Sequence, residues 1–332
     1  MKVDAAKPEA EIIDQAAQFI KNRELVAFPT ETVYGLGAGA FSPSAVEKIF
    51  LAKGRPAANP LLVHVSNLEQ VGEIAREITP PARILMDNFW PGPLSIILPA
   101  RDNVPEIVRG GKDSVGLRMP DHPVALALIE QTGPLAAPSA NLSGRPSPLS
   151  AEHVKTDLDG RIAAVLDAGA TGLGVESTIL DLSGGPFRVL RRGGVAVEEL
   201  EKAIDEKIEV DIAAGGKFVH YQTSTQVILC KNRKEFENKL NQFQPEIKVG
   251  VVLYDDNQIN LNNFMGNGRE LKVYELDLSC PNSRLYSILR DAEESQLVFL
   301  IFAPLPQDLG GLARSLADRI KQAAAKENGR EV

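Results

Sequence analysis

The pattern of strands and helices changes near residue 207 of this 332-residue chain. Before that point, short strands and helices follow one another without regular alternation, and turn signals are dense. Beyond it, strands that are almost entirely apolar, such as 248–253 and 296–302, alternate with helices. Apolar strands that alternate with helices are typical of a small parallel sheet. The sequence therefore predicts two domains of different fold classes.

Residues 1–206 are predicted to form an α+β domain around a twisted mixed sheet. Residues 207–224 are interpreted as a linker, and residues 225–332 as a small Rossmann-like α/β domain with a parallel sheet. The expected helices of the chain are 9–22, 42–52, 67–78, 80–89, 123–132, 197–206, 233–242, 282–295 and 311–326. The expected strands are 25–28, 60–65, 94–98, 114–118, 163–166, 177–182, 187–190, 226–230, 248–253, 271–276 and 296–302.

The composition argues against several classes of function. A formal net charge of −8 and an aromatic content of 5% do not suit a broad nucleic-acid-binding face or a base-stacking platform. Cys230 and Cys280, the two cysteines, suggest neither a disulfide framework nor a zinc site. No apolar run reaches the roughly 18 residues of a membrane helix, and the polar start does not resemble a signal peptide. We therefore expect a cytoplasmic protein that does not bind membranes.

Lys53, Arg55, Asn59 and His64 lie in one short polar string that leads into and closes an expected strand. A lysine is a compact point charge and an arginine is a planar fork, and such a pair suits a polyphosphate. A second interpretation is that two solvated cations complement a helix dipole and that His64 is a core residue of its strand. The residues alone leave both interpretations open.

Ser139 and Asn141 lie between Pro138 and Gly144. A hydroxyl and an amide at alternate positions of a proline-bounded loop can share one ligand. A turn in which the two side chains bond to nearby backbone groups explains the same residues. The sequence does not decide between the turn and the site.

The remaining motifs are weaker. Thr30 and Thr32 place hydroxyls just after an expected strand, where a small polar substrate can bind. The glycines of 35–39 lack the third spaced glycine and the acidic partner of a dinucleotide-binding loop, so we reject that interpretation. The histidines and acidic residues show no metal-ligand spacing, and no serine or cysteine lies in a nucleophile motif.

Seven strings, in this order, resemble the L-threonylcarbamoyladenylate synthase family, which is built on a YrdC-like domain. They are P-T-E-T-V-Y-G-L-G (29–37), K-G-R-P-A-A-N-P-L (53–61), W-P-G-P-L (90–94), V-G-L-R-M-P (115–120), P-S-A-N-L-S-G (138–144), G-V-E-S-T (174–178) and L-R-R-G (190–193). The resemblance is dense over 10–205. The strings at 285–290 and 310–320 also resemble the extra C-terminal domain of the longer members.

The resemblance implies a reaction in which L-threonine, bicarbonate or CO2 and ATP give threonylcarbamoyl-AMP and pyrophosphate. The product feeds the threonylcarbamoyl modification of an adenosine in certain tRNAs. Mg2+ bound with ATP is implied as the cofactor, and no metal ligands of the protein are implied. The implied partners are proteins that receive the product, with weak or indirect tRNA binding. A carbamoyltransferase and an RNA-binding module are the alternatives.

The same resemblance assigns roles to individual residues. The signature tetrad of the family matches Lys53, Arg55, Ser139 and Asn141. Contacts with ATP are implied for Arg55, Asn59, Ser114, Ser139, Ser147, Arg191 and Tyr221. Contacts with threonine are implied for Thr32, His64, Arg118, Ala137 (through its backbone) and Ser177.

The linker departs from the family pattern. Longer members usually carry P-G-M-K-Y-x-H-Y-x-P, whereas this chain reads G-G-K-F-V-H-Y-Q-T at 215–223 and lacks the methionine and both prolines. His220 and Tyr221 are retained. Because proline restricts the backbone and glycine frees it, we expect a looser lid over the active site.

Overall fold

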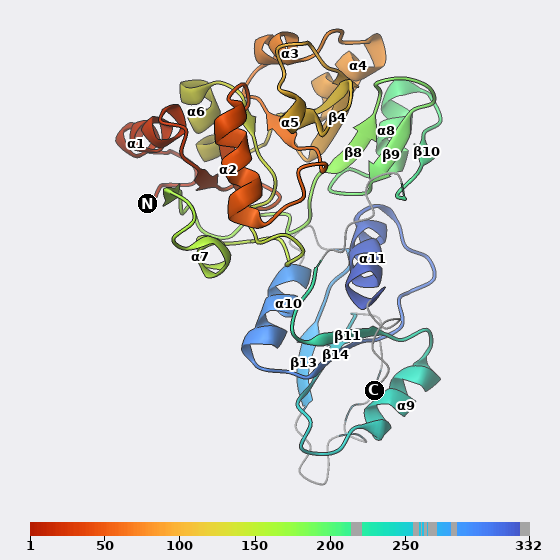
Figure 1. Cartoon of the computed structure of the whole chain (residues 1–332). Coiled ribbons are helices and arrows are strands. Elements are labelled where there is room, and N and C mark those ends of the chain that lie inside the picture. The colour runs from red at the N-terminus through yellow and green to blue at the C-terminus, as the bar shows by residue number, and fades with distance from the viewer. Residues whose placement is uncertain are drawn as a thin grey trace. The chain divides into compact units, whose positions relative to one another are not determined.

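A computed structural model describes residues 1–213, 221–254, 259, 261, 264, 271–279 and 284–325 (Figure 1). The chain divides into two compact units. The first comprises Met1–Ser143 and Ser147–Lys217, and the second comprises Gly144–Pro146 and Phe218–Val332. The predicted linker, 207–224, lies partly outside the described residues, as do His220 and Cys280. Its boundaries, and the looser lid expected there, stay predictions.

The first unit is built on a mixed ten-stranded sheet in the order β10-β9-β8-β4-β5-β3-β6-β2-β1-β7. Its strands are β1 (Val26–Phe28), β2 (Gly35–Gly39), β3 (Leu62–His64), β4 (Leu94–Pro99), β5 (Ser114–Arg118), β6 (Leu135–Ala136), β7 (Ala164–Val165), β8 (Thr178–Asp181), β9 (Arg188–Arg191) and β10 (Glu209–Val210). Its helices are α1 (Ala10–Lys21), α2 (Pro43–Lys53), α3 (Leu68–Ile74), α4 (Pro80–Phe89), α5 (Glu106–Arg109), α6 (Pro123–Thr132), α7 (Ala151–Leu158) and α8 (Val197–Ile204). The predicted α+β class with a mixed sheet is confirmed.

The centre of this sheet brings distant parts of the sequence side by side. Strand β5 pairs parallel with β3 and antiparallel with β4, and β4 pairs parallel with β8. Strand β8 then pairs antiparallel with β9. The ends of β3, β5, β8 and β9 therefore carry polar side chains from four separate segments.

Helix α2 ends where its sequence predicts. Pro43 occupies its first turn, where the missing N–H costs nothing. Gly54 follows its last residue with φ of 61°, a left-handed conformation that glycine adopts without strain. The N–H groups of Gly54 and Arg55 both bond back to the carbonyl of Phe50, which closes the helix. This closure fixes Lys53 in the last turn of the helix.

Two apolar clusters hold the first unit together. One packs residues of α1 and α6, such as Ile13 and Leu128, against Val26 and Phe28 of β1. The larger one extends along α2, α4 and the strands in the middle of the sheet. Burying a large aliphatic or aromatic side chain contributes about 1.5–3 kcal/mol, so these clusters anchor the strand ends that carry the polar residues.

The second unit contains a four-stranded sheet in the order β11-β14-β12-β13, and every pairing in it is parallel. Its strands are β11 (Gln226–Leu229), β12 (Val249–Leu253), β13 (Leu271–Glu275) and β14 (Phe299–Phe302). Its helices are α9 (Arg233–Gln242), α10 (Leu285–Glu294) and α11 (Gly311–Ala324). The predicted parallel-sheet α/β class is confirmed. No helix among the described residues is long and apolar enough to cross a membrane.

Five elements were not predicted: β2, β6, α5, α7 and β10. Strand β2 contains the glycine-rich string 35–39, which pairs antiparallel with β1. A Cβ atom on Gly37 would lie 2.8 Å from the Phe28 ring. The glycine therefore makes room for an aromatic side chain, which agrees with the rejection of a dinucleotide-binding loop.

Candidate active site

The Lys53 ammonium group lies at the centre of one polar cluster. The side chain is buried, with 2% of the residue exposed, and Nζ donates to the carbonyl oxygens of Ser139 and Asn141, both at 2.5 Å. Burial first, and then the charge of Arg55, lower the pKa of Lys53 well below its usual value. An ammonium has three N–H groups, and two of them hold the loop that carries Ser139 and Asn141.

That loop is also held by backbone bonds to β2 and the residue before it. Leu36 donates to the Pro138 carbonyl and Ala140 donates to the Tyr34 carbonyl, each at 2.8 Å. Within the loop, the Ser139 hydroxyl donates to Asn141 Oδ1 at 2.5 Å. The local hydrogen bonding expected of a simple turn is thus present, and the same loop also contacts Lys53.

Arg55 and Arg191 lie close enough for their charges to interact. Burial and the charge of Arg191 lower the pKa of Arg55 to about 10. Arg55 donates to the carbonyls of Asn59, at 3.5 Å, and Pro60, at 3.1 Å. Arg191 donates from Nε to the Ser177 carbonyl and from Nη2 to the Ser177 hydroxyl, each at 3.0 Å. Two cations held together in this way favour an anion between them.

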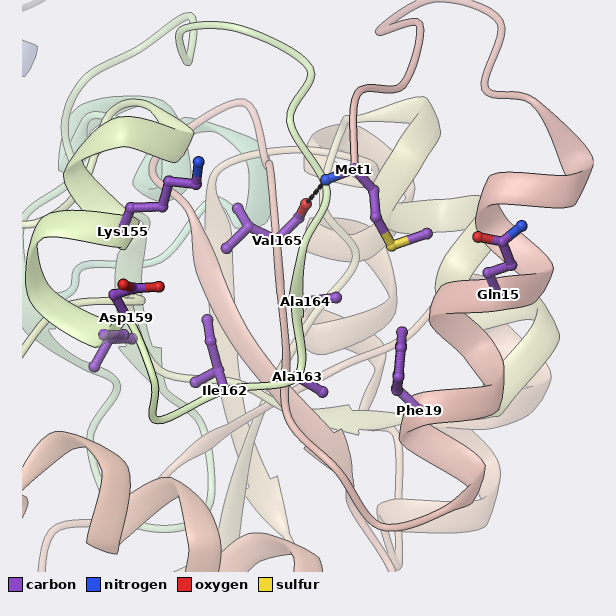
Figure 2. A pocket seen from close by; sticks show the side chains of 10 residues that line it. Met1, Gln15, Phe19, Lys155, Asp159, Ile162, Ala163, Ala164 and Val165 are labelled. Atoms are coloured by element: carbon purple, nitrogen blue, oxygen red, sulfur yellow. Dashed lines mark hydrogen bonds between the residues drawn. The ribbon is translucent and has the colours of Figure 1, made fainter.

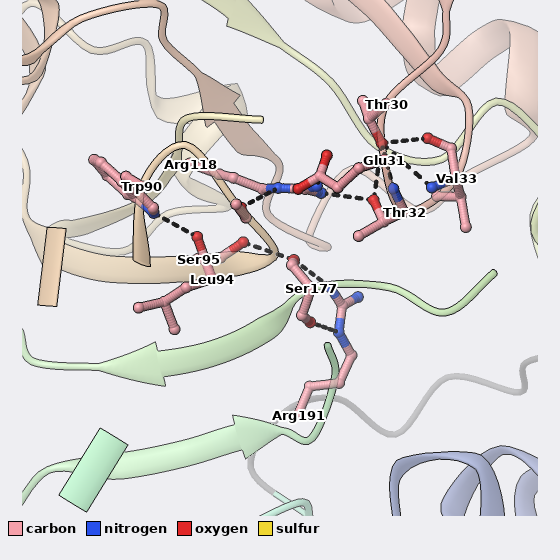
Figure 3. Close-up of polar contacts among 11 residues, drawn as sticks. Thr30, Glu31, Thr32, Val33, Trp90, Leu94, Ser95, Arg118, Ser177 and Arg191 are labelled. Carbon is pink, nitrogen blue, oxygen red and sulfur yellow. Dashed lines mark hydrogen bonds and ion pairs between the residues drawn. The ribbon is translucent and has the colours of Figure 1, made fainter. Parts of the chain in front are cut away.

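Arg118 is the centre of a second cluster (Figure 3). Its side chain is 5% exposed and lies at the end of β5. Nε donates to the Gly92 carbonyl at 3.2 Å, Nη1 donates to the Thr32 hydroxyl at 2.9 Å, and Nη2 lies 2.7 Å from Glu31 Oε2. The Thr32 hydroxyl also bonds to that of Thr30 at 2.8 Å. A buried guanidinium held by several acceptors is preorganised to receive a carboxylate.

His64 is neutral and partly unsatisfied. It is opposite Arg118 in the register of β3 and β5, and its ring meets the Phe28 ring edge to face at 6.1 Å. Burial and the charge of Arg118 lower its pKa to about 3. Nδ1 is buried and has no hydrogen-bond partner among the described residues. A core histidine is normally satisfied, so this open nitrogen favours a ligand-binding role.

Ser177 connects the cluster around Arg191 with the sheet centre. Its hydroxyl bonds to that of Ser95 at 2.8 Å and accepts from Arg191 (Figure 3). A Cβ atom on Gly193 would lie only 2.2 Å from the backbone of Ser177 and Thr178. The turn after β9 therefore approaches Ser177 in a way that only glycine permits.

The other predicted residues are less closely joined. The Ser147 hydroxyl donates to the buried Glu176 carboxylate at 2.7 Å, and Ala137 donates its N–H to the Leu62 carbonyl. Ser114 begins β5. Among the contacts of the described residues, none joins the Ser114 side chain to the other predicted residues. Tyr221 belongs to the second unit, where its ring stacks on Tyr286 at 5.1 Å.

Glu31 and Ser95 contact predicted site residues but were not themselves predicted. Glu31 stands between Thr30 and Thr32, and a carboxylate within a polar string after a strand was a usable signal. Ser95 lies inside an apolar strand, and the sequence gives no signal that its hydroxyl meets Ser177.

A pocket of about 390 Å³ lies elsewhere in the first unit, beside β7 (Figure 2). Its polar side chains, Gln15, Lys155 and Asp159, are exposed, and the Met1 amine at its rim donates to the Val165 carbonyl at 2.8 Å. None of the predicted site residues lines it. The pocket therefore does not bear on the candidate active site.

The sequence of the chain matches two family models. The Sua5/YciO/YrdC model, described as "Telomere recombination", matches residues 18–193, which is more than half of the chain. The model described as "Threonylcarbamoyl-AMP synthase, C-terminal domain" matches residues 195–325. The chain belongs to the Sua5/YciO/YrdC family. The resemblance inferred from the seven strings is thus confirmed.

Relatives named threonylcarbamoyl-AMP synthase share this family over long alignments. The protein of Pyrococcus abyssi is 47% identical over 254 residues, which cover 71% of this chain and 75% of the relative. The protein of Bacillus subtilis is 40% identical over 327 residues, which cover 94% of this chain and 92% of the relative. This family member therefore matches the second relative over nearly its whole length.

Solved structures agree with the sequence comparison. The crystal structure of P. abyssi Sua5 complexed with L-threonine is similar to this chain with a TM-score of 0.87 and 38% identity, and 98% of each chain is covered. The structure of Escherichia coli YciO has a TM-score of 0.53 and 25% identity, and covers 58% of this family member.

Proposed function

We propose that this chain is a threonylcarbamoyl-AMP synthase, an enzyme that condenses L-threonine, bicarbonate or CO2 and ATP to threonylcarbamoyl-AMP and pyrophosphate. The observation that carries the proposal is a set of three cations in the first unit, of which Lys53 is buried and Arg55 and Arg191 are half-buried. Lys53 and Arg55 interact electrostatically with each other, as do Arg55 and Arg191. A polyphosphate is the kind of ligand that such a set fits. The names of the similar proteins support the same conclusion.

The amino acid would bind at the cluster around Arg118. The Arg118 guanidinium offers a fork to the substrate carboxylate. The hydroxyls of Thr32 and Ser177, together with the neutral Nδ1 of His64, offer acceptors and donors for the amine and the side-chain hydroxyl of threonine. The threonine complex of P. abyssi Sua5 supports this choice of amino acid.

The reaction needs positioning and charge neutralisation more than covalent help. The threonine amine adds to CO2 to form a carbamate, and a carbamate oxygen then attacks the α-phosphorus of ATP and displaces pyrophosphate. Because a carbamate decays in water, a site lined by buried side chains protects it. Lys53, Arg55 and Arg191 would neutralise the charge that develops on the phosphate oxygens and on the leaving pyrophosphate. Such a reaction makes the enzyme a nucleotidyltransferase.

Mg2+ would enter as a companion of ATP. In nucleotide sites this ion is typically held by phosphate oxygens and water, with one or two carboxylates. The described residues contain no group of three histidine, cysteine, aspartate or glutamate side chains that could hold a metal. The described residues are therefore compatible with a Mg2+ ion that is held mainly by the phosphate oxygens of ATP. When bound, the ion would add charge neutralisation at the phosphates.

The remaining parts of the proposal concern partners and location. Threonylcarbamoyl-AMP would pass to proteins that modify tRNA, and contact with tRNA itself would be weak or indirect because the formal net charge is −8. Contacts of ATP with Asn59, Ser114, Ser139, Ser147 and Tyr221 stay predictions. A cytoplasmic location also stays a prediction.

The test is threonine-dependent release of pyrophosphate by the purified full-length chain supplied with ATP and bicarbonate. We expect release with L-threonine and only background without it. Arg118→Gln should abolish the threonine-dependent release of pyrophosphate. Arg83→Gln, which breaks an exposed pair with Asp87, should leave that release unchanged. No release with all three substrates, together with tight tRNA binding, would instead favour the RNA-binding alternative. Release of pyrophosphate from carbamoyl phosphate and ATP without threonine would favour a carbamoyltransferase.

A further inference from the structure

Glu31 is a buried carboxylate that its surroundings do not satisfy. Its side chain is 14% exposed. Neither carboxylate oxygen has a hydrogen-bond partner among the described residues, although Oε2 forms an ion pair with Arg118 Nη2 at 2.7 Å. Burying a charged oxygen without hydrogen bonds is costly, and such groups in folded proteins call for an explanation.

The position of Glu31 is fixed by its own turn. The Thr30 hydroxyl accepts from the N–H groups of Thr32 and Val33 (Figure 3). The Glu31 carbonyl accepts from the Leu173 N–H at 2.7 Å. These bonds hold the backbone of the turn in place before any ligand arrives, and the ion pair with Arg118 restrains the Glu31 side chain. It is therefore unlike a mobile surface carboxylate that happens to meet an arginine.

Arg118 retains capacity for a ligand while it is paired with Glu31. A guanidinium has five N–H groups. Two of them donate to the Gly92 carbonyl and the Thr32 hydroxyl, and a third belongs to Nη2, which faces the Glu31 carboxylate in the ion pair. The two others are available to an incoming carboxylate, so the pair can stay together when an amino acid binds.

An α-amino acid carries a carboxylate and an ammonium group on one carbon. The pair of Arg118 and Glu31 presents the complementary charges side by side, at 2.7 Å. His122, which is half-buried, is a further titratable group whose charge interacts with Glu31. Arg118 is thus matched to the carboxylate, which leaves Glu31 as the anionic group that matches the ammonium.

We propose that Glu31 binds the α-amino group of the amino acid substrate, an inference that rests on the proposed function. The contact fills the unsatisfied carboxylate oxygens and selects ligands with an α-amine over hydroxy acids or plain carboxylic acids. The nitrogen keeps one N–H after it has formed a carbamate, so Glu31 can hold the same atom before and after CO2 adds. Selection for an α-amine is what a carbamate-forming reaction requires.

The test compares two ligands in two variants, by calorimetry without bicarbonate. L-threonine has the α-amine, and 3-hydroxybutanoate lacks it but keeps the carboxylate and the hydroxyl. We expect Glu31→Gln to weaken the binding of L-threonine by about tenfold or more, as for a lost charge-assisted hydrogen bond. The affinity for 3-hydroxybutanoate should stay nearly unchanged. Glu24→Gln is the matched control, because Glu24 pairs with Lys48 at the same 2.7 Å distance on the surface. It should change neither affinity.

Two outcomes of the calorimetry would overturn the inference. Equal weakening of both ligands would show that Glu31 only supports Arg118. Tighter binding of threonine by Glu31→Gln would show that Glu31 competes with the substrate carboxylate. If the variant does not fold, a crystal structure of the wild-type chain with L-threonine decides: the substrate nitrogen should lie within hydrogen-bond distance of Glu31, and a nitrogen placed elsewhere refutes the inference. Threonine-dependent pyrophosphate release by the wild type is measured alongside, so that failure of the proposed function is seen separately.

Discussion

His64 lies directly opposite Arg118 where the parallel strands β3 and β5 pair, and both side chains are buried. The burial of the ring and the charge of Arg118 keep His64 uncharged, with a pKa of about 3. A neutral imidazole beside a guanidinium gives one cationic group for a carboxylate and one uncharged group for a hydroxyl or amine. The pairing of two strands thus places a cationic and an uncharged polar group side by side.

His64 should make the stability of the protein depend on pH. Its pKa is about 3 in the folded chain and about 6.5 when unfolded, so the unfolded state binds more protons between these values. The stabilisation is therefore fully present above about pH 6.5 and is lost as the pH falls. Between pH 7 and pH 5 the wild type should lose about 1–2 kcal/mol more unfolding free energy than His64→Gln. Urea unfolding of both proteins at the two pH values measures this, and equal losses would contradict it.

Arg118→Lys should separate charge from geometry. Lysine keeps the positive charge but cannot serve the Gly92 carbonyl, the Thr32 hydroxyl and a carboxylate with one planar fork. We expect the KM for threonine to rise by about 10–100-fold, as for loss of a bidentate charge-assisted contact, with little change in the KM for ATP. Steady-state pyrophosphate release measures both constants. An equal rise in both would show that Arg118 acts on the whole domain.

Lys53→Met should lower kcat/KM by about 100-fold or more, the usual scale for loss of a preorganised electrostatic group. The change removes the ammonium group and also leaves the carbonyls of Ser139 and Asn141 without their donor. Lys48→Met is the control on the exposed side of the same helix, since Lys48 forms a surface ion pair with Glu24. Comparable loss in both variants would indicate damage to α2 and not to the active site.

Arg191→Gln should weaken the binding of ATP but not that of threonine. It removes one of the two charges that favour an anion beside Arg55, while the Ser177 contacts can be kept in part by the amide. We expect about a tenfold loss of ATP affinity, which should shrink at high salt because ion pairing is screened. Titration calorimetry at two salt concentrations measures this. A loss of threonine affinity with unchanged ATP affinity would indicate that Arg191 belongs to the threonine-binding cluster around Arg118.

Gly193→Ala should destabilise the first unit by several kcal/mol, because the new Cβ would lie 2.2 Å from the Ser177 backbone and something must shift. Gly184→Ala is a suitable control, since nothing lies within 4 Å of its Cβ position. Thermal unfolding of the two variants provides the comparison. Equal melting temperatures would mean that the turn after β9 is freer than the structure shows.

Much of the fold could be predicted because local signals agree with tertiary structure. Ser42, Pro43 and Gly54 bound helix α2 as expected, and the apolar strands of the second unit are parallel as expected. Strand β2 was missed because glycine is depleted in strands. Glycine is needed at position 37 because the Phe28 ring of the neighbouring strand packs against it, which the local sequence does not show. Helix α7 was missed although Ser150 caps it by accepting from the His153 N–H, a signal that the sequence does contain.

The candidate site was predictable only in part. The strings showed which residue types to examine, and the structure brings Lys53 to the loop of Ser139 and Asn141. No local pattern shows that Glu31 meets Arg118, because that contact depends on how the β1–β2 turn and β5 come together. The meeting of Ser95 with Ser177 depends in the same way on the pairing of β4 with β8.

The most direct test of the account is to incubate the purified chain with ATP, L-threonine and carbon-13-labelled bicarbonate and to analyse the products by mass spectrometry. We predict an adenylate that contains threonine, appears together with pyrophosphate and takes up the labelled carbon. Pyrophosphate or AMP formed without such a labelled threonine adduct would contradict it.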